Sequence, residues 1–193
     1  DHFTLGLVFL SIFFAIFYLT FLAYKLLQKE QFKSIDIVLL MVNSFLFYGM
    51  GYVLLSQHNL GEQLLGLFTL VNALVHFIVG LFIYRQKLVD KNLFYLVVGL
   101  VLVFVSIAIP VQLDGNWVSL LWVGQAALLF WIGRTKEVLF YEKLSLPVML
   151  LAFISIVHDW SSVYEAFDPE FPETRLIPLW NINFLTSVVF IFA

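Results

Sequence analysis

The chain alternates long apolar runs with short polar breaks. Each run has about 20 residues, and at 1.5 Å per helical residue this matches the hydrocarbon thickness of a bilayer. The runs must be helices, because an isolated strand cannot satisfy its backbone in lipid and barrel strands would alternate polar and apolar residues. The pattern predicts that residues 1–193 form an all-α, polytopic transmembrane helical bundle with about six full spans and one partial span. The predicted spans are residues 3–27, 36–56, 63–84, 93–113, 117–133, 144–160 and 179–193.

The composition agrees with a membrane location and excludes several classes of functional site. The chain is 62% hydrophobic and 12% charged, whereas a soluble domain has about 25% charged residues. A net charge of −3 gives no basis for a nucleic acid partner, and the absence of cysteine excludes disulfides and thiolate metal sites. No phosphate-binding loop, HExxH or GxSxG motif is present. We therefore expect no catalytic residue, no cofactor and no enzymatic activity, and we expect the lipid bilayer as a partner.

Basic residues predict the orientation in the membrane. Nine of the ten Lys and Arg residues lie in the breaks after the first, third and fifth spans, and such residues mark the cytoplasmic side. The amino end is therefore expected outside, and the acidic segment 161–178 is expected to be an extracytoplasmic loop. Because the chain begins at Asp1 and ends at Ala193 within an apolar run, we expect a fragment of a longer protein with further transmembrane helices.

The third span has one face of small and polar residues. These residues recur every three or four positions, with Asn72 at the edge of the face: Gly66, Thr69, Ala73, His76 and Gly80. The opposite side is apolar and suits lipid: Leu67, Phe68, Leu70, Val71, Leu74, Val75, Ile78 and Leu81. Small residues allow close helix contact and polar residues supply hydrogen bonds across it. This face is therefore predicted to point into the bundle.

Depth along the spans predicts a layer of polar groups inside the membrane. Asn43, His76 and Gln125 each lie seven or eight residues from the predicted cytoplasmic end of their span, which places them about 11–12 Å from the same membrane face. A short loop joins the second and third spans, so these are expected to be antiparallel neighbours with Asn43 within reach of His76. The candidate layer consists of Asn43, Asn72, His76 and Gln125.

The polar layer has two interpretations. Its members can join helix to helix, at roughly 0.6 kcal/mol for each hydrogen bond. Alternatively, they line a small cavity or pathway in which His76 is the titratable member. No Asp, Glu, Lys or Arg lies deep in a predicted span, which disfavours an ion-coupled pump. We expect a non-enzymatic membrane scaffold or envelope-associated interaction protein, with a transporter or channel-like protein as the alternative and any small-molecule ligand unknown.

The break between the fourth and fifth spans predicts a tight turn. Asp114 and Gly115 form its centre, and Trp117 begins the next span as an interface anchor. Pro110 lies in the last turn of the preceding span, where it predicts a kink. Polar residues near this edge provide possible metal ligands: His58, Glu62, Asp114, His158 and Asp159. No spacing fixes their geometry, so we expect no metal site.

Three stretches resemble a known family. They are LLMVNSFLFYGMGYVLL around Asn43, NALVHFIVGLFIYR around His76, and IAIPVQLDGNWVSLLWVGQAALLFWIGR from Ile107 to Arg134. Together with Asn181-Ile182-Asn183-Phe184-Leu185, they resemble bacterial membrane proteins of domain-of-unknown-function family 2339. The resemblance runs from about Asp36 to the end. It implies a multi-pass protein of the bacterial cytoplasmic membrane, with more spans on both sides, and it leaves the activity open. Many relatives carry Glu where this chain has Gln125.

Overall fold

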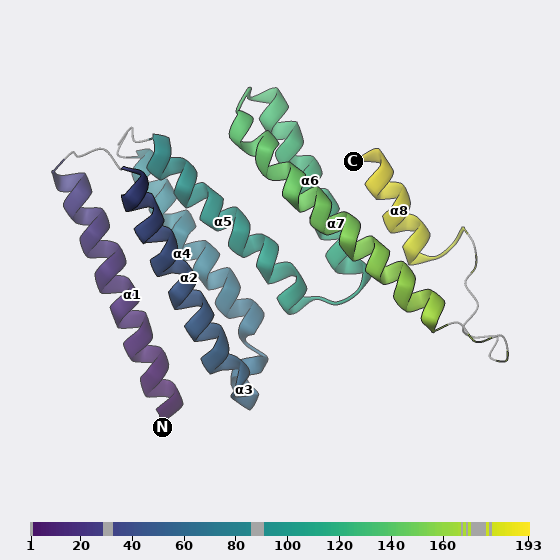
Figure 1. Cartoon of the computed structure of the whole chain (residues 1–193), viewed down its shortest axis with the longest axis horizontal. Helices are drawn as coiled ribbons and strands as arrows, with labels where there is room; N and C mark the ends of the chain where they lie inside the picture. The colour runs from purple at the N-terminus through teal and green to yellow at the C-terminus, as the bar shows by residue number, and fades with distance from the viewer. Residues whose placement is uncertain are drawn as a thin grey trace. The chain divides into compact units, whose positions relative to one another are not determined.

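The described part of the chain is entirely helical. The computed structural model describes residues 2–28, 33–85, 91–166, 168, 170, 177 and 179–193. Within them the chain forms eight helices and no strand (Figure 1). The helices are α1 His2–Leu27, α2 Ser34–Ser56, α3 Asn59–Glu62, α4 Leu65–Arg85, α5 Lys91–Gln112, α6 Asn116–Thr135, α7 Leu139–Glu165 and α8 Ile182–Phe192. The predicted all-α fold class is confirmed.

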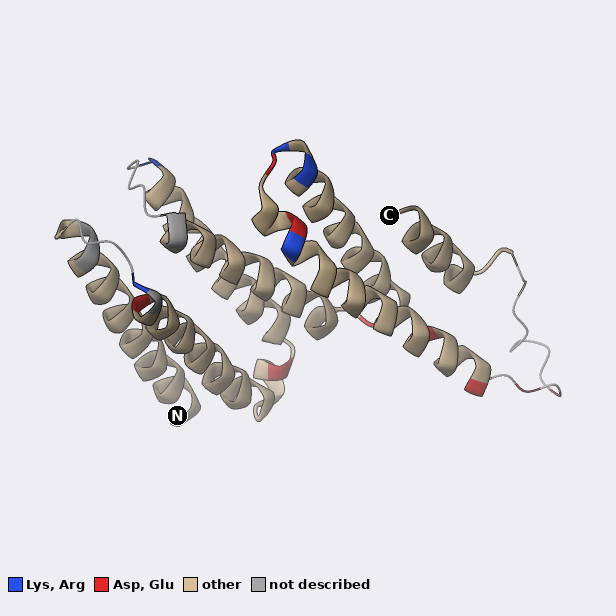
Figure 2. Ribbon diagram, turned by 45° about the horizontal axis from the view of Figure 1, so that its top comes forward, with Lys and Arg blue, Asp and Glu red and all other residues tan. Residues whose placement is uncertain are grey.

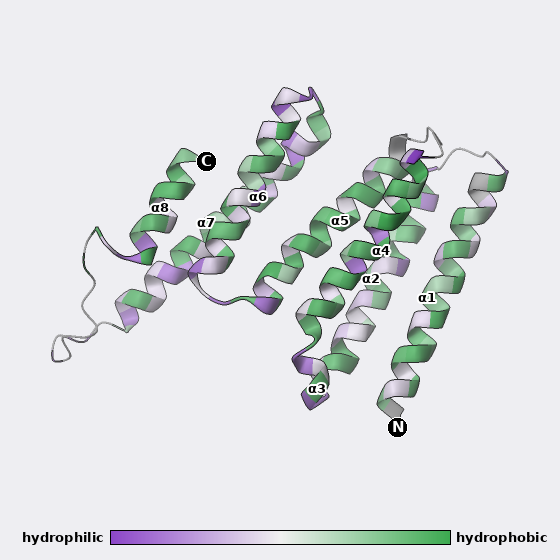
Figure 3. Cartoon of the chain, turned by 180° about the vertical axis from the view of Figure 1, so that it is seen from behind, coloured by the Kyte–Doolittle hydropathy of each residue, from purple (hydrophilic) through white to green (hydrophobic). Residues whose placement is uncertain are grey.

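The long helices have the dimensions of membrane spans. Six of them, in the described ranges, are long and apolar enough to cross a bilayer, and α8 is a shorter apolar helix. Figure 3 shows hydrophobic residues along the long helices, and many large ones are exposed, among them Phe13, Leu46 and Phe77. Such surfaces are stable only in lipid or against other helices. The chain is therefore an integral, multi-pass membrane protein, and the six long helices match the six full spans that the apolar runs predict.

Three helices differ from the prediction: α3, α7 and α8. The short helix α3 was not predicted. Helix α7 extends beyond the predicted span 144–160 at both ends, so Pro147 lies well inside it and residues 161–165 are helical instead of loop. Hydropathy finds only the apolar part of a helix, and α7 continues through polar residues. Helix α8 begins after Asn181, whose Oδ1 accepts a hydrogen bond of 2.8 Å from the backbone N–H of Phe184. Of the predicted loop, residues 167, 169, 171–176 and 178 lie outside the described residues.

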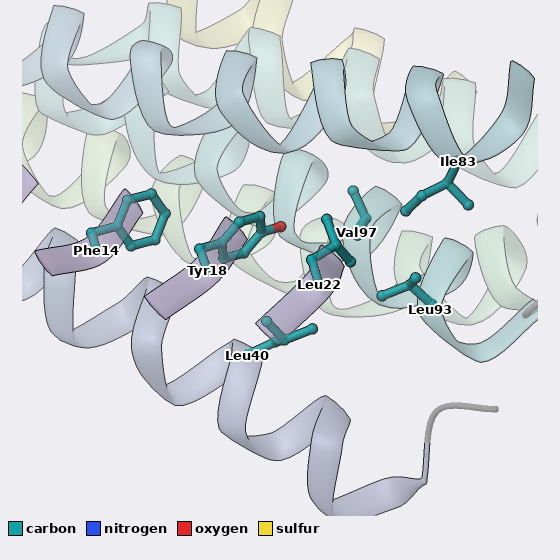
Figure 4. Close-up of a cluster of buried hydrophobic side chains, with 7 residues drawn as sticks. All are labelled: Phe14, Tyr18, Leu22, Leu40, Ile83, Leu93 and Val97. Carbon is teal, nitrogen blue, oxygen red and sulfur yellow. The ribbon is translucent and has the colours of Figure 1, made fainter. Parts of the chain in front are cut away.

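The chain divides into two compact units. Unit 1 is Asp1–Gln112 and unit 2 is Leu113–Ala193. A core cluster of unit 1 takes buried side chains from α1, α2, α4 and α5 (Figure 4). They are Phe14, Tyr18, Leu22, Leu40, Ile83, Leu93 and Val97. In unit 2, α6 and α7 pack around Val123, Ala152 and Ile156, with Val189 and Phe190 of α8 against them. Each unit thus has its own apolar core.

Glycines set how closely neighbouring helices approach. On α4, a Cβ at Gly66 would meet the side chain of Gln112, and one at Gly80 would lie 3.4 Å from Val97 Cγ1, both on α5. At the end of α6, a Cβ at Gly133 would lie 2.6 Å from the backbone nitrogen of Glu142. Small residues therefore allow the close contacts of α4 with α5 and of α6 with α7.

The predicted turn before α6 is present. Gly115 adopts a φ of 58°, in the left-handed region that glycine enters without strain. Its carbonyl oxygen accepts a hydrogen bond of 2.9 Å from Val118 N–H. Pro110 lies near the end of α5, which continues to Gln112, and Trp117 is 64% exposed in the first turn of α6. Glycine at position 115 thus lets the chain end one apolar helix and begin the next within three residues, 113–115.

Candidate polar sites in the spanning helices

Helix α4 buries the face that its sequence predicts. All five small or polar residues at helical spacing are buried, as is Asn72. On the opposite side six of the eight predicted lipid-facing residues are exposed. The exceptions are Phe68 and Val75, which are half-buried; Phe68 stacks on Tyr48 of α2 with the ring planes 8° apart. The helical period thus identifies the inward face of α4.

His76 lies at the centre of this face and is fully buried. Its Nδ1 lies 2.7 Å from the carbonyl oxygen of Asn72. Because a carbonyl only accepts, Nδ1 carries the hydrogen and donates it. Nε2 lies 2.9 Å from the hydroxyl of Ser44 on α2, and that hydroxyl is also 3.0 Å from the carbonyl oxygen of Leu40. In the neutral imidazole, the single hydroxyl hydrogen of Ser44 is shared between Nε2 and Leu40. Both ring nitrogens of His76 therefore have partners.

Aromatic rings from two further helices enclose the imidazole. Tyr18 of α1 meets it edge-on, with ring centroids 5.4 Å apart, and Phe104 of α5 lies at 5.3 Å. Phe14 of α1 lies at 6.4 Å. Such ring contacts add to the burial of apolar surface. His76 of α4 thus contacts α1, α2 and α5, so all four long helices of unit 1 meet at this ring.

A second hydrogen bond joins α2 to α4 two turns away. The hydroxyl of Tyr48 lies 3.1 Å from that of Thr69, which is fully buried. Thr69 donates its own hydrogen to the carbonyl oxygen of Leu65 at 2.8 Å. Tyr48 is therefore the donor in the interhelical bond. With Ser44 and His76, these residues form a polar seam between α2 and α4.

The predicted polar layer is only partly reproduced. Asn72 and His76 are buried side by side on α4, as expected. The hydrogen-bond partner of His76 Nε2 on α2 is Ser44, the residue next to Asn43 in sequence. Counting residues from the end of a span gives the depth of a residue in the membrane, but it does not show which neighbouring helix the side chain faces. Gln125 is half-buried on α6 and belongs to unit 2.

Two buried side-chain amide atoms in unit 1 have no hydrogen-bond partner among the described residues, unlike His76 and Thr69. Asn72 donates from Nδ2 to the carbonyl oxygen of Phe68 at 2.9 Å. Its Oδ1, and Nδ2 of Asn43, are buried and hydrogen-bond to none of the described residues. Most buried polar atoms in proteins are paired. These two atoms are therefore the part of the layer that differs from ordinary helix packing.

A polar network that the sequence analysis missed lies in unit 2. Asp159 of α7 is only 7% exposed, and its Oδ2 accepts hydrogen bonds from Ser119 Oγ at 2.6 Å and Asn116 Nδ2 at 3.3 Å, both on α6. Asn116 Nδ2 also donates to Asn183 Oδ1 of α8 at 2.5 Å, and Ser119 lies 2.8 Å from Ser155 Oγ. The network joins α6, α7 and α8.

The helical period contained a signal for this network. The buried residues of α7 are Ser145, Val148, Ala152, Ile156 and Asp159, spaced three or four apart. This spacing places Asp159 on the buried face, one residue before the end of the predicted span 144–160. Asp159 lies near the outer end of α7, at the edge where the sequence places it, and its carboxylate is buried there. Of the suggested metal ligands, Asp159 is in this network, and the described residues form no group of three or more metal-binding side chains.

Comparison with family models, with curated proteins and with solved structures finds no match for this chain.

Proposed function

We propose that the protein is a non-enzymatic membrane scaffold or an envelope-associated interaction protein. The supporting observation is that both nitrogens of His76 are bonded inside unit 1 and that its ring is enclosed by aromatic side chains. A group that carries protons or substrate has to exchange partners with water during its cycle. His76 instead holds four helices together, which is the role of a packing residue.

A transporter or channel-like protein is the second candidate, and two observations favour it. The buried Nδ2 of Asn43 and Oδ1 of Asn72 have no partners among the described residues. Asp159 also provides a buried carboxylate, the kind of group that ion pathways use. Continuous helices favour the scaffold, because transporters of this kind have broken helices at the binding site.

The proposed location is the bacterial cytoplasmic membrane, with the amino end of this segment outside. Support comes from charge: Arg134, Lys136 and Lys143 lie at the junction of α6 and α7, while Asp114 and Glu165 lie at the opposite ends of these helices (Figure 2). Basic residues favour the cytoplasmic side. Membership of family 2339 is part of the same proposal and rests on the motifs quoted above.

The two candidate functions differ in whether water enters the polar layer. The chain has no cysteine, so single cysteines at Asn43, Asn72, His76 and Gln125 can be tested in membranes with small polar thiol reagents. We expect protection at all four positions, because the scaffold leaves the layer dry. Each variant should become reactive after unfolding in detergent, which shows that the thiol is intact.

Cysteines at Gly115 and Lys136, the exposed ends of α6, are the matched controls. Both should react, and from opposite sides of the membrane. Reaction at Asn72 or His76 in the folded protein would contradict the scaffold and favour a pathway. Reaction of both control positions from one side would contradict the proposed orientation.

A further inference from the structure

Asp159 is a buried carboxylate without a described counter-charge. It is 7% exposed, and no Lys, Arg or His of the described ranges forms an ion pair with it. Its hydrogen bonds both end on one oxygen, Oδ2, and come from the neutral donors Ser119 and Asn116. The other carboxylate oxygen, Oδ1, accepts no hydrogen bond from the described side chains or backbone. Half of the carboxylate is thus left for another partner.

The hydrogens of the network can be assigned from its chemistry. Ser119 has one hydroxyl hydrogen, and an ionised carboxylate only accepts, so Ser119 donates to Asp159. Ser155 must then donate to Ser119 across their 2.8 Å contact, which leaves the lone pairs of the Ser155 oxygen free. The amide nitrogen of Asn116 donates to Asp159 and to Asn183, so its side-chain oxygen takes no part in these two hydrogen bonds. Donors converge on Oδ2 in the arrangement that suits an ionised carboxylate.

Nearby helix ends offset only part of this charge. Asn116 is the first residue of α6 and Asn183 the second of α8, so the network lies at the amino ends of both helices. The amino end of a helix carries about half a positive charge and favours a nearby anion. Two exposed ionisable residues are close in sequence, Asp114 before α6 and His158 directly before Asp159, and neither enters the network. A buried ionised carboxylate is normally paired or coordinated.

We propose that Asp159 binds an alkali-metal cation such as Na⁺, at the shared end of α6, α7 and α8. The charged ligand is Oδ1 of Asp159, and the hydroxyl of Ser155 and the side-chain oxygen of Asn116 are further oxygen donors of the same hydrogen-bond network. Oxygen ligands suit hard cations, and a single carboxylate supplies the charge for a monovalent ion. Because Asn116 also bonds Asn183, the bound ion stabilises the contact of α8 with α6. This site is independent of the proposed scaffold, which rests on unit 1.

The site predicts that alkali cations stabilise the protein. The purified full chain in detergent micelles should unfold several degrees higher in NaCl or KCl than in choline chloride at equal concentration. The shift should grow with the logarithm of cation concentration once the site begins to fill, as for any ligand that binds only the folded state. Choline matches the ionic strength but is too large to be bound by these oxygens.

Three variants test whether the shift depends on Asp159. Asp159→Asn keeps an acceptor for Ser119 but removes the charge, and should abolish the shift. Asp114→Asn removes an exposed carboxylate next to α6 and should retain it. Ser155→Ala keeps the carboxylate and should raise the cation concentration needed for half of the shift, so it serves if Asp159→Asn does not fold.

Three results would overturn the proposal. Equal unfolding temperatures of the unaltered chain in alkali and choline salts would exclude the site without any variant. A full shift in Asp159→Asn would place the ion elsewhere. Stability that changes with pH through Asp159, but not with alkali cations, would show that the carboxylate binds a proton instead.

Discussion

Replacing His76 by alanine is expected to lower the free energy of unfolding by about 2–4 kcal/mol. The change removes a fully buried ring and leaves a cavity among Tyr18, Ser44 and Phe104. It also leaves the hydroxyl of Ser44 with only its intrahelical partner. Because α1, α2, α4 and α5 all meet at this ring, no single helix can move to fill the space.

The unfolding of the two units can be followed by different signals, because helix content reports both units and tryptophan fluorescence reports unit 2. All five Trp residues lie in unit 2, at positions 117, 122, 131, 160 and 180. In His76→Ala the unfolding of unit 1, followed by circular dichroism, should shift while the tryptophan transition stays near that of the unaltered chain. Phe77→Ala is the control: Phe77 is 50% exposed on the same helix, and its loss should cost under about 1 kcal/mol. Equal effects of the two changes would contradict the central role of His76.

Gly133→Ala is expected to destabilise the α6–α7 pair by about 1–3 kcal/mol. The added methyl group would lie 2.6 Å from the backbone nitrogen of Glu142 and 3.0 Å from its Cα, and a helix backbone cannot move aside as a side chain can. The two helices must therefore separate near the junction that joins them. Tryptophan fluorescence reports the unfolding of unit 2, and it should show that this unit unfolds at a lower temperature in the variant.

Gly124→Ala is a matched control on the same helix. Nothing lies within 4 Å of a Cβ at position 124, so only helix propensity changes. Alanine is favoured over glycine in a helix by up to about 1 kcal/mol, so this variant should be neutral or slightly more stable. If both glycine variants lost the same stability, the close approach of α6 and α7 at Gly133 would be contradicted.

The spans and the inward face of α4 could be predicted because both depend on local patterns. Apolar length is sufficient to find a membrane helix. The spacing of Gly66, Thr69, Ala73, His76 and Gly80 is sufficient to orient one, since a helix repeats every 3.6 residues. Neither inference needs to know which helix is the neighbour. The short helix α3 and the polar ends of α7 carry no such pattern.

Contacts between helices could not be predicted in the same way. Asn43 and Ser44 differ by one position, and the choice between them as partner of His76 depends on how α2 is rotated against α4. Asn116 and Asn183 are 67 positions apart, so their hydrogen bond depends on the packing of α8 against α6. The division into two units at residue 112 likewise follows from packing and is not visible in the hydropathy pattern.

The hydrogen bond between Ser44 and His76 tests most directly whether the polar layer is a helix-to-helix contact. A double-mutant cycle with Ser44→Ala and His76→Ala measures it, with Asn43→Ala and His76→Ala as the parallel cycle. We expect the first pair to be coupled by about 0.6–1.7 kcal/mol, the range for such bonds in membranes. The second pair should be additive within about 0.5 kcal/mol. Additivity of Ser44 with His76, or coupling of Asn43 in its place, would contradict the packed seam between α2 and α4.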